Sequence, residues 1–298
     1  MKSYLEATAR ARLEAVFDGG SFREFVPPAS RVVSPHLAQL DAPVSFDDGV
    51  AVGTALLGGM RVFAAAQEGG FMGGAVGEVH GAKLVGMLRA AVQHRAEAVV
   101  LLLESGGVRL HEANAGLIAV SEVMRAVLDT RAAGIPVLAL IGGANGCFGG
   151  MGIVARCTNV VIMSDEARLG MSGPEVIETA SGVEDFDSQD RALVWRTTGG
   201  KHRTMLGDSA MLVDDDASAF RQAAIDTMAR LRSQPVELTL DALEAEQQMF
   251  AERLERYGAA EDSLDIWTAL GVPEPQQLPL LDAAAFMRLT ANHRMGGA

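Results

Sequence analysis

The feature that most constrains the fold is the alternation of short, wholly apolar runs with amphipathic segments. Residues 98–103, 137–141 and 160–163 are apolar throughout, which is typical of strands buried on both faces of a sheet. Residues 78–96 and 112–133 precede two of these runs and carry apolar side chains at every third or fourth position, which predicts helices. Because parallel strands are joined by such crossover helices, the sequence predicts an α/β fold with a mostly parallel sheet.

The segments before this alternation have different signatures. Apolar residues between positions 4 and 17 have helical spacing and are followed by glycines, which predicts an N-terminal helix. The prolines between positions 27 and 35 predict a connector that is neither helix nor inner strand. Residues 49–66 contain two apolar runs around a Gly-Gly pair, which predicts a β-hairpin.

The character of the chain changes after about residue 234. Residues 238–256 predict a long, charged amphipathic helix, and the prolines at 272–275 predict a linker. A chain of 298 residues is long for one domain but short for two. We therefore expect one main domain over residues 1–235 and a helical C-terminal appendage over residues 236–298.

Composition excludes several classes of protein. A formal net charge of −13 argues against general nucleic-acid binding, and a phosphate-bearing ligand would need a local basic patch or a basic partner. Cys147 and Cys157 are too few for a four-cysteine zinc ribbon and are expected to be buried thiols. The acidic runs at 184–187 and 214–216 are expected to be helix caps and solvated turns. We find no membrane-spanning run and no secretory signal, so a cytoplasmic location is expected.

Glycine pairs come after two of the apolar runs. Gly106 and Gly107 follow the first run, and Gly149 and Gly150 close a glycine-rich segment after the second. In open α/β structures, ligands bind at the carboxyl ends of strands, where glycine lets the backbone approach a ligand and leaves N–H groups free to donate. Any one pair could equally form a tight turn. Several pairs at successive strand ends favour a binding site.

Several segments occur in the order found in the biotin-linked acyl-CoA carboxyltransferases, a crotonase-like family. They are residues 11–22, 73–78, 104–112, 149–150 and 172–177, and the resemblance covers about residues 10–235. Within this family the chain most resembles the β subunits of biotin-independent malonate decarboxylases. The resemblance implies a crotonase/ClpP-like ββα superhelix and a γ partner subunit of similar fold that completes the site. It also implies an acyl carrier protein subunit with a CoA-like prosthetic group, and an acyl carrier protein transferase subunit.

The resemblance also implies a reaction and a set of site residues. Decarboxylation of a malonyl thioester to an acetyl thioester and CO2 leaves an enolate, which backbone N–H donors stabilise by about 3–4 kcal/mol each, so no nucleophile is needed. No tightly bound cofactor, metal or biotin is expected on this chain. The implied oxyanion hole consists of the N–H groups of Ala66, Gly106 and Gly107. The implied thioester-binding residues are Gly73, Gly74, Arg109, Gly149, Gly150, Ser172, Gly173 and Pro174.

Two other functions are compatible with this resemblance. One is the carboxyltransferase subunit of a biotin-dependent acyl-CoA carboxylase, which would use the same fold and enolate chemistry with carboxybiotin as second substrate. The bacterial acetyl-CoA carboxylase β subunit carries a zinc ribbon that this chain cannot form, which disfavours that assignment. The other is a noncatalytic scaffold that docks the carrier protein while a partner performs the reaction.

Other candidate motifs are weaker. Ser172 lacks the spacing of a nucleophile elbow, and His111 is not followed by a second histidine at the metalloprotease spacing. Arg109 could bind a carboxylate or phosphate, or form a structural ion pair with Glu112. The remaining histidines are scattered and are expected to have surface or structural roles; they are His36, His80, His94, His202 and His293.

Overall fold

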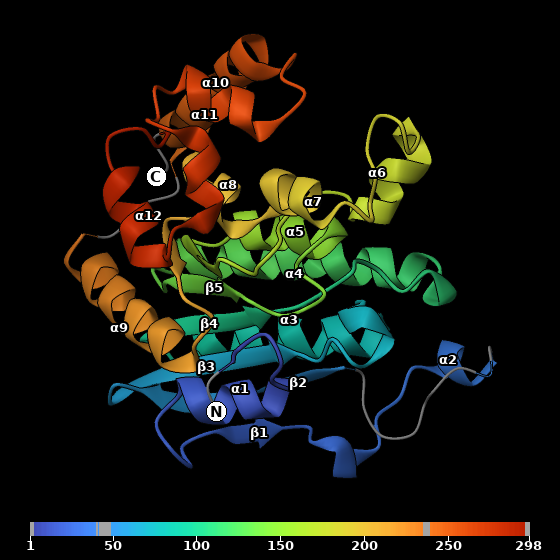
Figure 1. Ribbon diagram of the computed structural model, residues 1–298. Coiled ribbons are helices and arrows are strands. Elements are labelled where there is room, and N and C mark those ends of the chain that lie inside the picture. Colours follow the sequence, from blue (N-terminus) through green and yellow to red (C-terminus); the bar gives the residue numbers. More distant parts are fainter. Residues whose placement is uncertain (1–2, 40, 42–48, 235–238, 296–298) are drawn as a thin grey trace.

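The computed structural model describes residues 3–39, 41, 49–234 and 239–295. Its centre is a seven-stranded sheet in which the strands lie side by side in sequence order (Figure 1). The strands β1 to β3 pair antiparallel, and β3 to β7 pair parallel, which confirms the predicted α/β class. The strands are β1 (Arg23–Phe25), β2 (Val50–Leu57), β3 (Met60–Gln67), β4 (Ala98–Leu103), β5 (Val137–Ile141), β6 (Val160–Ser164) and β7 (Met211–Val213).

Helices cover both faces of the sheet. One hydrophobic core lies between the sheet and α3, α4 and α5, and a second lies between the sheet and α1 and α9. The helices are α1 (Ala9–Val16), α2 (Pro35–Gln39), α3 (Glu78–Gln93), α4 (Asn114–Ala132), α5 (Gly149–Arg156), α6 (Pro174–Ser181), α7 (Arg191–Thr198), α8 (Gly200–Met205), α9 (Ala217–Ser233), α10 (Leu240–Tyr257), α11 (Ser263–Ala269) and α12 (Ala283–Leu289).

The two cores explain why the inner strands are apolar at every position. Alternate side chains of a strand point to opposite faces of the sheet. In β4, Leu101 and Leu103 lie in the core under α3 to α5, whereas Val100 and Leu102 lie in the core under α1 and α9. All four side chains are buried. Truncating Leu101 to alanine would therefore leave a cavity and cost about 2–5 kcal/mol.

A second, shorter set of parallel bridges follows the main strands. The segment between β3 and α3 bridges the segment between β4 and α4 through Val76 and Val108, and Ser105 bridges Cys147 after β5. Cys147 in turn bridges Leu169 after β6. Each unit thus consists of a main strand, a short extended segment and, for the first three units, a helix that packs back onto the sheet. This is the ββα arrangement that the resemblance implies, and it brings the segments after β3, β4 and β5 to one edge of the sheet.

The boundaries near the N-terminus differ from the prediction. The first helix begins at Ala9 rather than near residue 4, because the Thr8 side chain accepts a hydrogen bond from the N–H of Ala11 and caps the helix. The proline-rich segment was expected to contain no helix, but it forms a 3-10 turn at Pro28–Ser30 and the short helix α2. Proline is compatible with the first position of a helix, so here it starts helices instead of excluding them.

The C-terminal region is helical, as predicted, and α10, α11 and α12 gather at one end of the molecule (Figure 1). A third hydrophobic core joins Trp267 and Phe286 from this region to Met205 and Leu212 from the sheet side. The segment predicted as a linker at 272–275 belongs to this core, because Val272 is buried there and a 3-10 helix follows at Pro275–Leu280. Among the described helices, none has both the length and the hydropathy that a membrane span requires.

Candidate functional site

The structure brings the predicted glycine segments together at one edge of the sheet. The N–H of Gly106 donates to the carbonyl of Gly73 at 2.8 Å, which joins the loop after β3 to the loop after β4. A Cβ atom on Gly149 would lie 3.1 Å from the Cα atom of Gly107, so the loop after β4 also contacts the start of α5. The N–H of Gly149 donates to the carbonyl of Met171 at 3.0 Å, which places the segment before α6 beside them.

The remaining members of the predicted thioester-binding set line the same loops. Gly74 has a φ of +69°, and a side chain there would collide with the backbone carbonyl of Glu104, so only glycine fits. Gly150 lies in the first turn of α5. Ser172 is half-buried, Gly173 caps α6 and Pro174 begins it.

The backbone donors of the predicted oxyanion hole are not equivalent. Ala66 is fully buried within the sheet and pairs with β2 on one side and β4 on the other, so its N–H belongs to the ladder. The N–H of Gly106 is used in the bond to Gly73. The N–H of Gly107 donates to the Oγ atom of Ser105 at 3.1 Å, a hydroxyl that a ligand oxygen can replace.

The start of α5 supplies a further donor. The N–H of Gly149 is used by Met171, but no described residue accepts from the N–H of Gly150, which lies in the first helical turn. The positive end of the α5 dipole favours an anionic oxygen at this position. Among the described residues of these two loops, the N–H groups of Gly107 and Gly150 are thus bonded to no backbone carbonyl.

Arg109 has the second of the two roles that the sequence left open. Its side chain is buried, its Nη1 atom lies 3.3 Å from the Oε1 atom of Glu112, and its guanidinium lies over the ring of Phe71, 5.0 Å from the ring centre. At 1% exposure the residue offers a ligand almost no surface. These contacts support a structural ion pair instead of a contact with the thioester.

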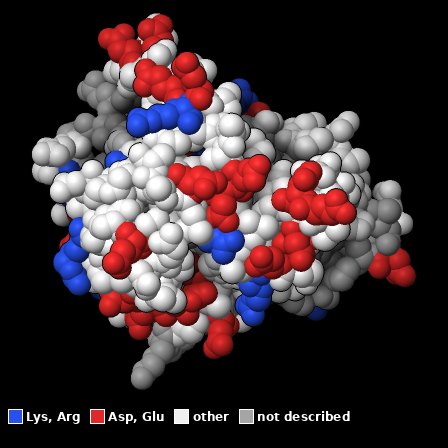
Figure 2. Space-filling model, turned by 45° about the horizontal axis from the view of Figure 1, so that its top comes forward, with Lys and Arg blue, Asp and Glu red and all other residues white. Residues whose placement is uncertain are grey.

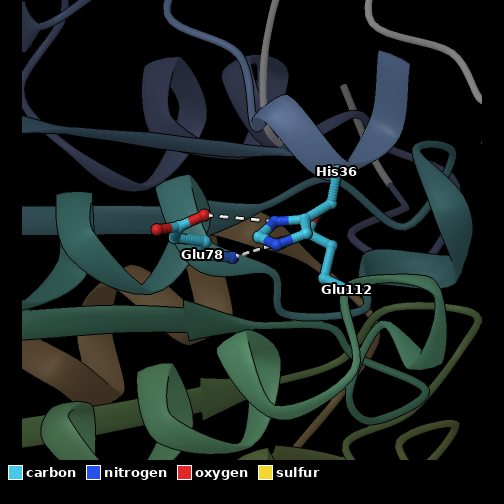
Figure 3. Close-up of side chains that lie close together, drawn as sticks. All are labelled: His36, Glu78 and Glu112. Carbon is cyan, nitrogen blue, oxygen red and sulfur yellow. Dashed lines mark hydrogen bonds and ion pairs between the residues drawn. The ribbon is translucent and has the colours of Figure 1, made fainter. Parts of the chain in front are cut away.

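One of the histidines expected to be scattered lies in a cluster. His36, Glu78 and Glu112 converge from α2, α3 and the turn before α4 (Figure 3), and their ligand-type atoms all lie within 4.8 Å of one another. Both oxygens of Glu112 already accept hydrogen bonds, from Arg109 and from the backbone N–H of Glu78. The neighbouring guanidinium and these occupied oxygens disfavour a metal ion, and the cluster instead fastens α2 to the start of α3. No sequence spacing linked these three residues.

A buried polar network lies beneath the loops after β4 and β5, which we term the glycine loops. Sequence reasoning did not predict this network. Glu104 forms an ion pair with Arg12, and its backbone N–H donates to the side chain of Gln67 at 3.1 Å. Gln67 in turn bonds to His80 at 3.0 Å between their Nε2 atoms, and Asn145 donates to the Glu104 carboxylate. The sequence offered one signal, since Arg12 and Glu104 each lie in a segment that carries the family resemblance.

The cysteines offer no nucleophile at this site. Cys147 is buried, as expected, and burial raises the pKa of its thiol far above the usual range. Cys157 is only half-buried, which corrects the expectation that both thiols are buried, and desolvation raises the pKa of its thiol as well. Both thiols therefore stay protonated and unreactive near neutral pH.

Exposed apolar side chains occur in the segments that follow or adjoin the candidate site, and we term these residues the apolar rim. Its members come from the turn before α4, the first turns of α4 and the region of α6, and each exposes more than half of its surface. They are Leu110 (83%), Leu117 (57%), Ile118 (61%), Met171 (65%) and Val176 (59%). Exposed apolar patches of this kind mark interaction surfaces.

Charge on the surface agrees with the acidic composition. Figure 2 shows acidic side chains spread over one face of the molecule, with lysine and arginine only in small, separate groups between them. This face therefore offers no continuous basic surface for a phosphate-bearing ligand.

The fold, with its short bridges beyond the main strands, defines a crotonase-like protein of the carboxyltransferase type. Residues 6–251 match the model of the carboxyl transferase domain, and the chain belongs to this family, which confirms the resemblance seen in the sequence. It is 41% identical over 296 residues to the malonyl-S-ACP:biotin-protein carboxyltransferase MADC of Malonomonas rubra, covering 93% of this chain and 92% of that protein.

Solved structures give the same assignment. A chain of a Pseudomonas malonate decarboxylase hetero-tetramer in complex with malonate superimposes with a TM-score of 0.80 at 39% identity, covering 88% of this chain and 95% of that chain. A chain of a Pseudomonas malonate decarboxylase hetero-dimer superimposes with a TM-score of 0.63 at 38% identity, covering 77% and 89%.

Proposed function

We propose that this chain is the β-type subunit of a malonate decarboxylase, which converts a malonyl thioester on an acyl carrier protein to the acetyl thioester and CO2. The observation that carries the proposal is the meeting of the loop after β4 with the start of α5, where the N–H of Gly107 is bonded to the Ser105 hydroxyl and the N–H of Gly150 to no described residue. Among the described side chains near these loops we find no activated nucleophile, and this reaction requires none. The similarity to malonate decarboxylase chains supports the decarboxylation, and the malonyl-S-ACP in the name of the Malonomonas relative supports the thioester substrate.

The proposed reaction is a simple redistribution of electrons. The thioester carbonyl oxygen accepts hydrogen bonds from Gly107 and Gly150 after displacing the Ser105 hydroxyl. The bond between the carboxylate and the α-carbon breaks, its electron pair forms the enolate and CO2 leaves. A proton from water or from a partner group then gives the acetyl thioester. Each donor that is aimed at the developing oxyanion contributes about 3–4 kcal/mol to transition-state stabilisation.

A partner subunit is expected to complete the site. The residues of the apolar rim are exposed in the isolated chain, and we propose that a partner of similar fold covers them and excludes water from the reaction. The related malonate decarboxylase structures are hetero-oligomers, which supports this proposal. We propose the γ subunit as this partner, with an acyl carrier protein and its transferase as further subunits, and basic residues for the prosthetic-group phosphates on a partner. A cytoplasmic location stays a prediction.

A second candidate differs only in the fate of the carboxyl group. The name of the Malonomonas relative describes transfer of the carboxyl group from malonyl-S-ACP to a biotin protein. The same oxyanion site would serve that reaction, because the enolate is the same. The acyl-CoA carboxylase and scaffold alternatives are less well supported, because relatives named for malonyl or malonate substrates cover most of the chain.

The identity of the product tests the proposal. The purified chain, combined with its partner subunit, is supplied with a malonyl thioester on a CoA-like arm, and products are quantified by mass spectrometry. We expect acetyl thioester and CO2 in equal amounts. Release of free malonate with an unacylated thiol would instead indicate a hydrolase, and the proposal would then be wrong.

A further inference from the structure

We infer that Glu104 is a positioning residue that holds the two glycine loops against each other and thereby aims the N–H donors of Gly107 and Gly150. The inference rests on the proposed function, because the donors matter only if an enolate oxygen lies between them. Glu104 itself is 4% exposed, so it offers a ligand little surface.

The two oxygens of the Glu104 carboxylate bind different parts of the chain. Oε2 pairs with Arg12, whose guanidinium also donates to the backbone carbonyls of Tyr4 and Leu5. Oε1 accepts from the backbone N–H of Asn145 at 3.1 Å and from its side-chain amide at 3.3 Å. One carboxylate therefore links the N-terminal segment, the loop after β4 and the loop after β5.

The two glycine loops run alongside each other from this link. The N–H of Ser105 donates to the carbonyl of Gly146 at 2.8 Å, and the N–H of Phe148 donates to the carbonyl of Ser105 at 2.8 Å. Gly107 follows two residues after Ser105, and α5 begins one residue after Phe148. A shift of the loop after β5 relative to Glu104 would therefore move the start of α5 relative to Gly107.

The backbone of two further loops lies close to the Glu104 carboxylate. A Cβ atom on Gly143, in the loop after β5, would collide with the Glu104 carboxyl group, and so would a Cβ atom on Gly69, in the loop after β3. Glycine at both positions lets the backbone approach the acidic side chain closely. Three loops of the site close around one carboxylate.

A stabilising role alone does not account for this arrangement. Removing two charges from water costs about as much as their attraction returns, so a buried ion pair contributes little to stability compared with apolar residues of the same size. The carboxylate instead fixes the positions of the groups that donate to it, because it holds Arg12 at one oxygen and Asn145 at the other. Preorganised donors are what an oxyanion site requires.

The test compares two double variants of equal charge and similar size. Arg12→Met with Glu104→Gln, the glutamine double variant, removes the ion pair but keeps an oxygen that accepts from Asn145. Arg12→Met with Glu104→Met, the methionine double variant, removes the ion pair and that oxygen. We expect kcat of the assembled complex to be at least about tenfold lower for the methionine double variant than for the glutamine double variant, as part of one donor's 10²–10³ effect is lost. We also expect the KM for the malonyl thioester to agree within about twofold, because these donors bind the developing oxyanion much more strongly than the neutral carbonyl of the bound substrate.

A further variant covers the case in which the methionine double variant fails to fold. Asn145→Asp places a carboxylate of the same size as the amide opposite Glu104, on a half-buried loop where the fold should survive, and should also lower kcat at least about tenfold at unchanged KM. Equal kcat for the two double variants, or near-normal kcat for Asn145→Asp, would overturn the inference.

Amide hydrogen exchange separates this inference from the proposed function. Exchange in peptides covering 104–109 and 143–149 should rise in the methionine double variant and not in the glutamine double variant. If the wild-type complex failed to decarboxylate malonyl thioester, the proposed function would fall while the exchange experiment still tested the link between the loops. Unchanged exchange of both peptides in the methionine double variant would contradict the positioning role itself.

Discussion

Replacing Gly107 with valine tests the oxyanion site through the backbone. Gly107 has a φ of +132°, a region that residues with a side chain rarely adopt, and an added Cβ atom would meet no described atom within 4 Å. The cost of the substitution is therefore conformational and not a collision, on the order of 1–3 kcal/mol. The loop can relieve that strain only by rotating the backbone at Gly107, which carries the N–H donor away from the thioester oxygen.

The expected loss follows from the contribution of that donor. Removing one donor from an oxyanion hole lowers kcat by about 10²–10³, equivalent to about 3–4 kcal/mol. Gly134→Val is the matched control, because Gly134 also has positive φ, at +78°, and open space around its Cβ position, but lies before β5, at the opposite edge of the sheet. It should lose a comparable amount of stability and keep its turnover. Ser172→Ala and His111→Ala should have mild effects.

The assay is turnover of malonyl thioester by the assembled complex, with thermal unfolding and partner binding measured for every variant. A folded and assembled Gly107→Val variant with near-normal turnover would refute the assignment of the Gly107 donor. If Ser172→Ala abolished turnover instead, nucleophilic catalysis would replace the oxyanion account.

Three further predictions concern assembly and stability. The isolated chain should show no decarboxylation until its partner is added, and substantial activity of the well-folded chain alone would contradict a shared site. Leu243→Ser with Leu254→Ser on α10, a helix with no buried residue among those described, should weaken assembly in a binding assay without lowering the unfolding temperature, and unchanged affinity would exclude α10 from the interface. Burial, followed by the charge of Arg203, lowers the pKa of His202 to about 3 from 6.5, so the unfolded chain binds the extra proton and stability falls as pH drops below 6.5. Between pH 7 and pH 5, the free energy of unfolding should fall by about 2 kcal/mol less in His202→Phe than in the wild type, as measured by chemical denaturation. An equal fall in both proteins would contradict this.

Much of the fold could be predicted because its strongest signals are local. The runs at 98–103 and 137–141 match β4 and β5 to the residue, since a strand buried on both faces is apolar at every position. The start of the first helix was missed because the capping role of Thr8 was not recognised behind a continuous apolar pattern. Helices α5 to α8 were not assigned, since the glycine-rich and polar segments from 149 to 205 lack a clear period.

The part of the candidate site that is formed by glycine pairs could be predicted from the sequence. The pairs at 106–107 and 149–150 meet as expected because the ends of neighbouring parallel strands share one edge of the sheet. Contacts between distant positions left no such signal. Arg12 and Glu104 are 92 positions apart, so no spacing could join them. The choice between the two roles of Arg109 depended on burial, which only the folded chain shows.

The fate of the labelled carboxyl group tests the central claim most directly. Malonyl thioester labelled in its free carboxyl carbon is supplied to the assembled complex with and without avidin, which sequesters biotin, and the label is counted as CO2 and on protein. The proposed function predicts that all label is released as CO2, at the same rate in both conditions. Avidin-sensitive release, or label retained on a biotin protein, would contradict decarboxylation without biotin and establish carboxyl transfer in its place.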